Sequence, residues 1–215
     1  MPPHHPLATP TREGKLPIGV LASHGGTNLQ ALIDACADGS LHAEIRVVIS
    51  NNSRSLALKR ARRANIPTAH LSSATHPDSS RLDAAIANAL TAHRVELVAL
   101  AGYMRKLGTE TLSRYRNRIL NVHPALLPKF GGRGMYGERV HTAVLEAGEQ
   151  VSGASVHLVD EEYDRGPVIA QSEVPVLPGD TPDSLAARVL EQEHLLYPQT
   201  IRRIASGDIN LDSLA

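Results

Sequence analysis

The chain has 215 residues, of which 42% are hydrophobic and 20% are charged, and this composition is typical of one sizeable globular domain. Lys plus Arg equals Asp plus Glu at 22 each, so no net charge attracts the protein to nucleic acid or to a membrane. A single cysteine, Cys36, excludes an intrachain disulfide, and no apolar run approaches the roughly 20 residues of a membrane span, so we expect a cytoplasmic protein.

Residues 1–15 are rich in Pro and His and contain no apolar segment, so we expect a disordered tail and not a signal peptide. Strands and helices then alternate. The predicted strands are 16–22, 44–50, 66–71 and 95–101, and the predicted helices are 28–37, 56–64 and 81–93. This alternation predicts a parallel, doubly wound sheet with right-handed crossovers. The absence of Trp and the single Phe favour the same architecture, because its core consists of Ala, Val, Leu and Ile.

The second half has a different pattern. Two strands, 153–159 and 168–176, flank a turn at Asp164 and are expected to be antiparallel, with helices at 140–147 and 185–204. We therefore predict an α/β fold: a doubly wound, mostly parallel, Rossmann-like sheet with an antiparallel C-terminal extension and a closing helix. It would be one domain over residues 16–207, followed by a C-terminal tail at 208–215. Ligands of such sheets bind beyond the carboxyl ends of the strands.

The segment Ser23-His24-Gly25-Gly26-Thr27-Asn28 lies between the first predicted strand and the first predicted helix. Glycines there allow backbone amides to approach an anion, and the helix N-terminus adds a partial positive charge. The segment lacks the Walker lysine and the G-x-G-x-x-G spacing, which disfavours ATP and NAD. It predicts a phosphate site or, equally, a helix-capping turn in which Thr27 or Asn28 is the cap.

Asn121, His123 and Asp164 are the candidates for acyl-transfer chemistry. Asn121 and His123 follow strand-like residues at a spacing of two, so their side chains point to the same side. An amide and an imidazole can stabilise an oxyanion, and a nearby carboxylate raises the imidazole pKa and can take part in proton transfer. Each residue also has an ordinary structural alternative: a satisfied, partly buried histidine for His123, and a turn residue capping its own backbone for Asp164.

Six segments, in this order, resemble the phosphoribosylglycinamide formyltransferase family of the folate-dependent formyltransferase superfamily. The resemblance covers about residues 16–207. The segments that carry it are residues 23–30, 97–105, 121–128, 155–157, 164–169 and 193–194.

The resemblance implies transfer of a formyl group from 10-formyltetrahydrofolate to the amine of glycinamide ribonucleotide (5-phosphoribosylglycinamide) in purine synthesis, without a metal. It implies catalytic roles for Asn121, His123 and Asp164. It further implies that the phosphate and ribose of the ribonucleotide contact His24, Gly25, Gly26, Thr27, Asn28 and Glu193. The implied folate pocket is lined by Met104, Arg105, Leu107, Asn121, Val159 and Asp160. The partners would be these two small molecules, not nucleic acid or a membrane, and the protein would be a monomer or a homodimer.

Three departures from the family pattern concern the site. His24 replaces a glycine of the phosphate loop and either touches the phosphate or points to solvent. The glycine-rich segment 130–138 is longer than usual and is either a lid, with Arg133 approaching an anion, or a surface loop. Arg165 and Leu190 replace a glycine and a polar residue; we expect the first to be exposed, and the second puts one substrate contact in doubt.

Other members of the superfamily share the three catalytic residues and are the main alternatives. Methionyl-tRNA formyltransferase carries an additional nucleic-acid-binding domain after its catalytic domain, and formyltetrahydrofolate hydrolase carries an N-terminal regulatory domain; we expect neither domain here. Sugar formyltransferases are longer and lack the glycine loop. An alternative of another class is a folate- or nucleotide-binding protein without turnover, which the presence of all three catalytic residues disfavours.

Overall fold

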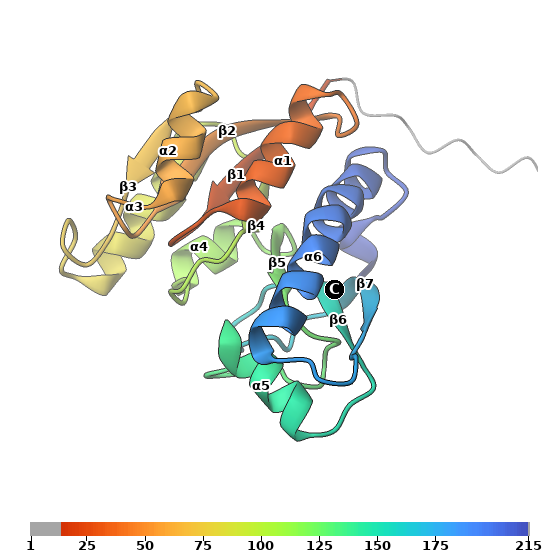
Figure 1. Cartoon of the computed structure of the whole chain (residues 1–215). Helices are drawn as coiled ribbons and strands as arrows, with labels where there is room; N and C mark the ends of the chain where they lie inside the picture. The colour runs from red at the N-terminus through yellow and green to blue at the C-terminus, as the bar shows by residue number, and fades with distance from the viewer. Residues whose placement is uncertain (1–13, 215) are drawn as a thin grey trace, which may run out of the picture.

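Seven strands form one mixed sheet in the order β3-β2-β1-β4-β5-β6-β7, with helices on both faces (Figure 1). The structure is a computed structural model that describes residues 14–214, so the predicted disordered tail, 1–15, lies outside it except for its last two residues. The strands are β1 Leu16–Leu21, β2 Ala43–Ser50, β3 Thr68–His70, β4 Leu97–Leu100, β5 Ile119–His123, β6 Val151–Leu158 and β7 Val168–Pro175. The helices are α1 Thr27–Ala37, α2 Leu56–Arg63, α3 Ser79–Ala92, α4 Thr109–Arg114, α5 Glu138–Glu146, α6 Pro182–Ala205 and a 3-10 helix, η1 Leu211–Leu214.

The sheet divides into a parallel and an antiparallel part. The pairs formed among β1 to β5 are all parallel, whereas the pairs β5–β6 and β6–β7 are antiparallel. The predicted doubly wound sheet with an antiparallel extension and a closing helix is therefore confirmed. The order 3-2-1-4 places the topological switch point between β1 and β4, and ligands bind beyond the carboxyl ends of the strands at such a point.

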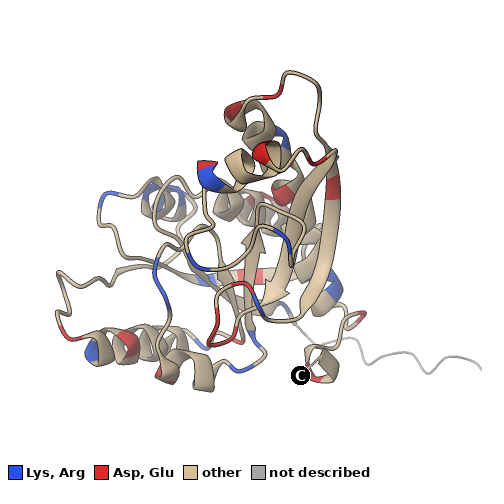
Figure 2. Cartoon of the chain, turned by 90° about the horizontal axis from the view of Figure 1, so that it is seen from below, with Lys and Arg blue, Asp and Glu red and all other residues tan. Residues whose placement is uncertain are grey.

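Each face of the sheet has its own hydrophobic core, as doubly wound connections require. Buried side chains of α1, α2 and α6 pack on one face, and those of α3 and the segment around α4 pack on the other. The parallel strands are buried on both sides, which explains their nearly continuous apolar sequences (for example LPIGVL in β1). Lys and Arg are scattered among Asp and Glu in the view of Figure 2, consistent with the balanced charge of the sequence.

Two short helices were not predicted. The sequence of α4, TETLSR, is only six residues long and rich in Thr and Ser, so it lacks a helical apolar period. The other, η1, lies in the predicted C-terminal tail, yet Leu211 is 4% exposed and Arg118 forms a 2.7 Å ion pair with Asp212. The packing of the chain therefore continues past residue 207.

Within residues 14–214, no helix is both long enough and apolar enough to cross a bilayer.

Candidate active site

The loops that follow β1 and β4 meet at the switch point of the sheet. The backbone amide of Ser23 donates to the carbonyl of Gly102 at 3.0 Å, and the hydroxyl of Ser23 accepts from the amide of Met104 at 2.8 Å. Ser23 is 1% exposed, so these bonds are shielded from water. They hold the glycine loop at 23–28 beside the segment at 102–107, the two segments expected to bind the two substrates.

Pairing between β5 and β6 brings three polar side chains to the next strand end. The register places Asn121 opposite His157 and His123 opposite Ser155. Because side chains alternate along a strand, Asn121, His123 and His157 share one side of the sheet. Asn121 Nδ2 lies 3.1 Å from His157 Nε2, and both histidines are almost fully buried.

Asp164 reaches this cluster from the loop between β6 and β7. The loop is closed at its base by the hydrogen bond from the amide of Leu158 to the carbonyl of Pro167, and a Cβ at Gly166 would lie only 2.0 Å from the Leu158 oxygen. Only glycine fits that approach. Asp164 itself has a φ of 54°, in the left-handed region that aspartate tolerates better than most residues. Its carboxylate is thereby directed inward, with the side chain 11% exposed.

The carboxylate of Asp164 lies between the two histidines. Oδ2 is 3.5 Å from His123 Nδ1, and Oδ1 is 3.5 Å from His157 Nε2. The amide of Gly132 donates to Oδ2 at 2.9 Å. Burial acts to raise the pKa of Asp164, but His157, His123 and this amide together lower it, so the carboxylate is ionised near neutral pH.

The pKa of His123 differs from our expectation. The sequence predicted that the carboxylate would raise it, and Asp164 does act in that direction. Burial has the larger effect, however, because an imidazolium in a dry environment loses its hydration, so the pKa of His123 is lowered overall. His123 Nε2 lies 2.8 Å from the carbonyl of Phe130 and therefore carries the proton of the neutral ring. The second proton binds at Nδ1, facing Asp164.

His157 belongs to the cluster although the sequence did not single it out as a site residue. It is 2% exposed, and Nδ1 lies 2.8 Å from the carbonyl of Leu158, which requires a proton on that nitrogen. In the neutral ring Nε2 then accepts from the amide of Asn121. The segment 155–157 carried part of the family resemblance, but only the β5–β6 register shows that His157 is paired with Asn121.

The N-terminus of α1, at the end of the glycine loop, has no side-chain cap. Gly26, with a φ of 66°, is the N-cap residue of α1, and neither Thr27 nor Asn28 caps the helix; the capping alternative is wrong. The first turn of α1 contains no acidic residue, and its N-terminus is therefore free to attract an anion. A Cβ at Gly26 would lie 2.8 Å from Ala57 of α2, so glycine is required there. His24 is exposed, which is compatible with both of the alternatives expected for it.

Asn28 and Glu193 meet across 165 residues of sequence. Asn28 Nδ2 donates to Glu193 Oε2 at 2.6 Å, and both residues are less than a tenth exposed. Burial raises the pKa of Glu193 to about 7, although the Asn28 hydrogen bond opposes the increase. The other amide atom, Asn28 Oδ1, is buried without a hydrogen-bond partner. An unpaired buried acceptor is costly, and a hydroxyl of a ligand is the kind of group that would satisfy it.

Glu193 is held in place by its own helix. Four residues later in α6, the fully buried Tyr197 donates to the carbonyls of Leu100 and Leu120 at 3.2 and 3.1 Å. Leu100 is the last residue of β4, and Leu120 immediately precedes Asn121 in β5. One side chain thus anchors α6 to both parts of the site.

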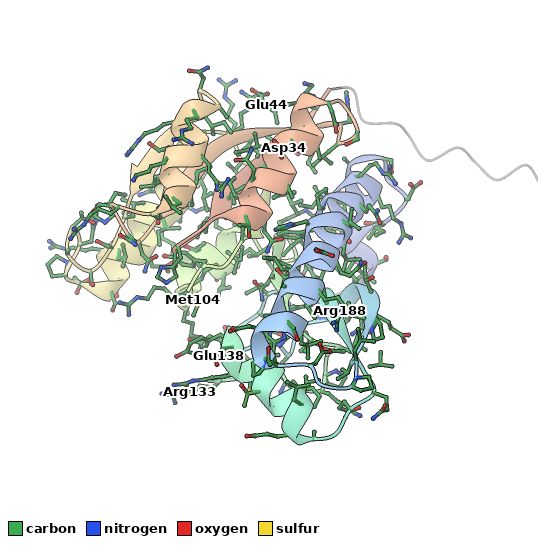
Figure 3. The ribbon with its side chains drawn as sticks, in the orientation of Figure 1. Asp34, Glu44, Met104, Arg133, Glu138 and Arg188 are labelled. Atoms are coloured by element: carbon green, nitrogen blue, oxygen red, sulfur yellow. The ribbon has the colours of Figure 1, made fainter. Side chains whose placement is uncertain are left out.

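The residues expected to contact folate form two walls. Met104 and Arg105 are exposed after β4, Val159 is half-buried after β6, and Asp160 is exposed. Leu107 is 5% exposed and its side chain packs in the core, so it can meet a ligand only through its backbone. In the view of Figure 3, the labelled Met104, Glu138 and Arg133 follow one another along the edge between α4 and α5.

An open cavity of about 530 Å³ lies next to the glycine-rich loop, and none of the predicted folate-contacting residues is in its lining. It is lined by Lys106, Gly132, Arg133, Glu161, Glu162, Tyr163 and Arg165. Lys106 lies 5.8 Å from the ring centre of Tyr163, a cation–π distance that joins the two walls. Arg165 is exposed, as expected, and Asp160, Glu161 and Glu162 form an exposed acidic stretch. Two further cavities lie at the amino-terminal edge of the sheet. Leu16 lines one and Lys15 lines the other, and no predicted site residue lines either of them.

No group of three or more His, Cys, Asp or Glu within residues 14–214 is arranged to hold a metal ion.

Comparison with known proteins agrees with this geometry. Residues 17–201 match the family model described as formyl transferase. The chain is 40% identical to phosphoribosylglycinamide formyltransferase of Escherichia coli, over 90% of this chain and 89% of that protein. It is also 40% identical to the chloroplastic phosphoribosylglycinamide formyltransferase of Arabidopsis thaliana, over 89% of this chain but 66% of that longer protein. The crystal structure of glycinamide ribonucleotide transformylase 1 from Symbiobacterium toebii superimposes with a TM-score of 0.85 and 45% identity, covering 90% of this chain and 89% of that one.

The chain therefore belongs to the formyl transferase family. Within that family, the relatives it matches over nearly their whole length are phosphoribosylglycinamide formyltransferases. The resemblance stated from the sequence is confirmed.

Proposed function

We propose that the chain transfers the formyl group of 10-formyltetrahydrofolate to the amine of 5-phosphoribosylglycinamide, as part of purine synthesis. The observation that carries the proposal is the convergence of Asn121, His123 and Asp164 at the same edge of the sheet as the N-terminus of α1, which has no side-chain cap. The choice of phosphoribosylglycinamide as the acceptor is supported by the names of the relatives, which include that compound.

The ribonucleotide would bind through its phosphate at residues 24–28 and through its ribose at Asn28 and Glu193. The glycine loop offers backbone amides to the phosphate without a cap to displace. Asn28 Oδ1 lacks a donor, and Glu193 is a buried carboxyl group, so together they can accept hydrogen bonds from sugar hydroxyls. Folate would bind along Met104, Arg105, the backbone of Leu107, Asn121, Val159 and Asp160.

In the reaction, the nitrogen of the ribonucleotide amine forms a bond to the formyl carbon, and negative charge develops on the formyl oxygen. Asn121 and the Nε2–H of His123 would donate to that oxygen, a kind of contribution worth about 3 kcal/mol per donor. The carbon–N10 bond then breaks. Over the whole step the amine loses one proton and N10 gains one, and Asp164 would assist this transfer through the adjacent Nδ1 of His123.

His123 must change partners for this to occur. Its Nε2 proton is bound to the carbonyl of Phe130, at the start of the glycine-rich segment 130–138. The same segment also contacts Asp164, because the amide of Gly132 donates a hydrogen bond to its carboxylate. A formyl oxygen that takes the Nε2 proton would have to displace Phe130, so we propose that this segment moves as a lid during the cycle.

Formyl transfer can be tested by following the loss of 10-formyltetrahydrofolate with and without glycinamide ribonucleotide. Loss that depends on the ribonucleotide would support the proposal, and formation of formylated ribonucleotide would identify the product. Loss without the ribonucleotide would indicate a hydrolase instead. Folate binding without any loss would indicate another amine acceptor or a binding protein.

The cytoplasmic location and the choice between monomer and homodimer stay predictions. Size-exclusion chromatography with light scattering distinguishes the two oligomeric states.

A further inference from the structure

Arg60 of α2 contacts the glycine loop from the side opposite α6, and the mechanism above leaves it without a role. Its Nε–H donates to the carbonyl of Gly25 at 3.0 Å, and Nη1 donates to Gln30 Oε1 of α1 at 3.1 Å. Of the described residues, Arg60 is the only Lys or Arg whose side chain is hydrogen-bonded to residues 23–28.

The bond to Gly25 fixes the direction of the next amide. The peptide bond between Gly25 and Gly26 is trans, so its C=O and N–H point in opposite directions. Because the carbonyl points toward α2, the N–H of Gly26 points away from it. The amide of Ala57 donates to the carbonyl of His24 at 3.1 Å, so α2 holds the loop at a second point.

The guanidinium also supplies a permanent positive charge. Neither residues 23–28 nor α1 contains Lys or Arg, and His24 is exposed. Two of the five N–H groups of Arg60 have partners in the described chain, and both partners belong to the glycine loop or to α1. The positive charge reaches α6 as well: burial lowers the pKa of His194, and Arg60 lowers it further.

We propose that Arg60 is the residue that makes the site selective for a phosphorylated acceptor, by aiming the Gly26 amide at the phosphate and by adding charge beside it. This inference rests on the proposed function. A group that is doubly negative requires more than helix-end partial charges to be bound strongly, and an arginine that orients the loop provides both effects.

The test compares glycinamide ribonucleotide with its dephosphorylated riboside as acceptors for the wild type, Arg60→Gln, Arg60→Lys and the control Arg62→Gln. Arg62 is exposed on the same helix and makes no hydrogen bond to the loop, so it controls for loss of one charge. For Arg60→Gln we expect KM for the ribonucleotide to rise about tenfold or more, with little change in kcat or in KM for 10-formyltetrahydrofolate. The preference for the phosphorylated acceptor should fall by the same factor. The wild type and Arg60→Gln should use the riboside equally well.

Arg60→Lys separates charge from aiming and also guards against misfolding of the Gln variant. It keeps the charge but not the planar fork, so its preference should lie between those of the wild type and Arg60→Gln. Equal losses with both acceptors, or an unchanged preference in Arg60→Gln, would overturn the inference. A wild type that formylates neither acceptor would instead overturn the proposed function.

Discussion

The two halves of the site are built from different materials. The phosphate half, at the ends of the parallel strands, consists of backbone amides and glycines within a six-residue loop. The catalytic half, at the antiparallel edge, consists of buried side chains from β5, β6 and the loop after β6. The N–H groups that bind an anion are provided locally by the loop, and in our proposal one arginine of the neighbouring helix α2 aims them. Moving a proton requires titratable groups with altered pKa values, and burial among distant segments is what alters them.

Removing the carboxylate of the catalytic half should have the largest effect. We expect Asp164→Asn to lower kcat by about 10²–10⁴-fold, because proton transfer is lost while the shape is kept. Asparagine tolerates the left-handed backbone at this position, so the fold should be retained. Steady-state kinetics with both substrates measures the effect. Turnover close to that of the wild type in a folded variant would show that the carboxylate of Asp164 is not needed for proton transfer.

Glu193, which lies beside the phosphate half, should make the free energy of unfolding depend on pH. The pKa of Glu193 is raised from 4.5 to about 7, so the folded state holds a proton that the unfolded state releases between these values. The resulting stability is present below about pH 4.5 and is lost as pH rises toward 7, by up to about 3 kcal/mol.

Glu193→Gln should remove this loss, so the variant should be more stable than the wild type at pH 8 and similar near pH 4.5. Urea unfolding at the two pH values measures the difference. Glu191→Gln, an exposed residue of the same helix, is the control and should follow the wild type. Parallel pH profiles of the wild type and Glu193→Gln would contradict the raised pKa.

The backbone character of the phosphate half can be tested with two neighbouring glycines. Gly26→Ala places a Cβ 2.8 Å from Ala57 at a positive φ, so we expect a loss of about 1–3 kcal/mol in the free energy of unfolding and a higher KM for the ribonucleotide. Gly25→Ala is the matched control, because a Cβ there meets no atom within 4 Å. Thermal unfolding and acceptor KM for the two variants give the answer. Equal behaviour would show that the contact with α2 does not shape the loop.

The helix shared by both halves should give the smallest effect. Tyr197→Phe leaves the carbonyls of Leu100 and Leu120 without this donor and should cost about 1 kcal/mol of stability. Turnover should stay within about twofold of the wild-type value, since the hydroxyl bonds to the backbone of Leu100 and Leu120 and to none of the predicted catalytic residues. A large loss of activity with unchanged stability would mean that α6 positions the substrates through Tyr197.

Local sequence was sufficient for most elements of the fold. Apolar strands followed by amphipathic helices predicted the parallel sheet, and the turn at Asp164 with its flanking strands predicted the antiparallel extension. The short α4 escaped prediction because its N-terminus is satisfied from outside the segment: Asp83 of α3 accepts from the amides of Gly108, Glu110 and Thr111. No local pattern can report a cap supplied 25 residues earlier.

The sequence by itself determined the family, the glycine loop and the candidates Asn121, His123 and Asp164, because motifs and side-chain chemistry are properties of short segments. Tertiary structure decided what surrounds them: the β5–β6 register that pairs His157 with Asn121, the contact of Asn28 with Glu193, and the lowered pKa of His123. Each of these depends on burial or on partners far apart in the chain. Burial and distant pairing exist only once the chain is folded, and for that reason they could not be predicted from the sequence.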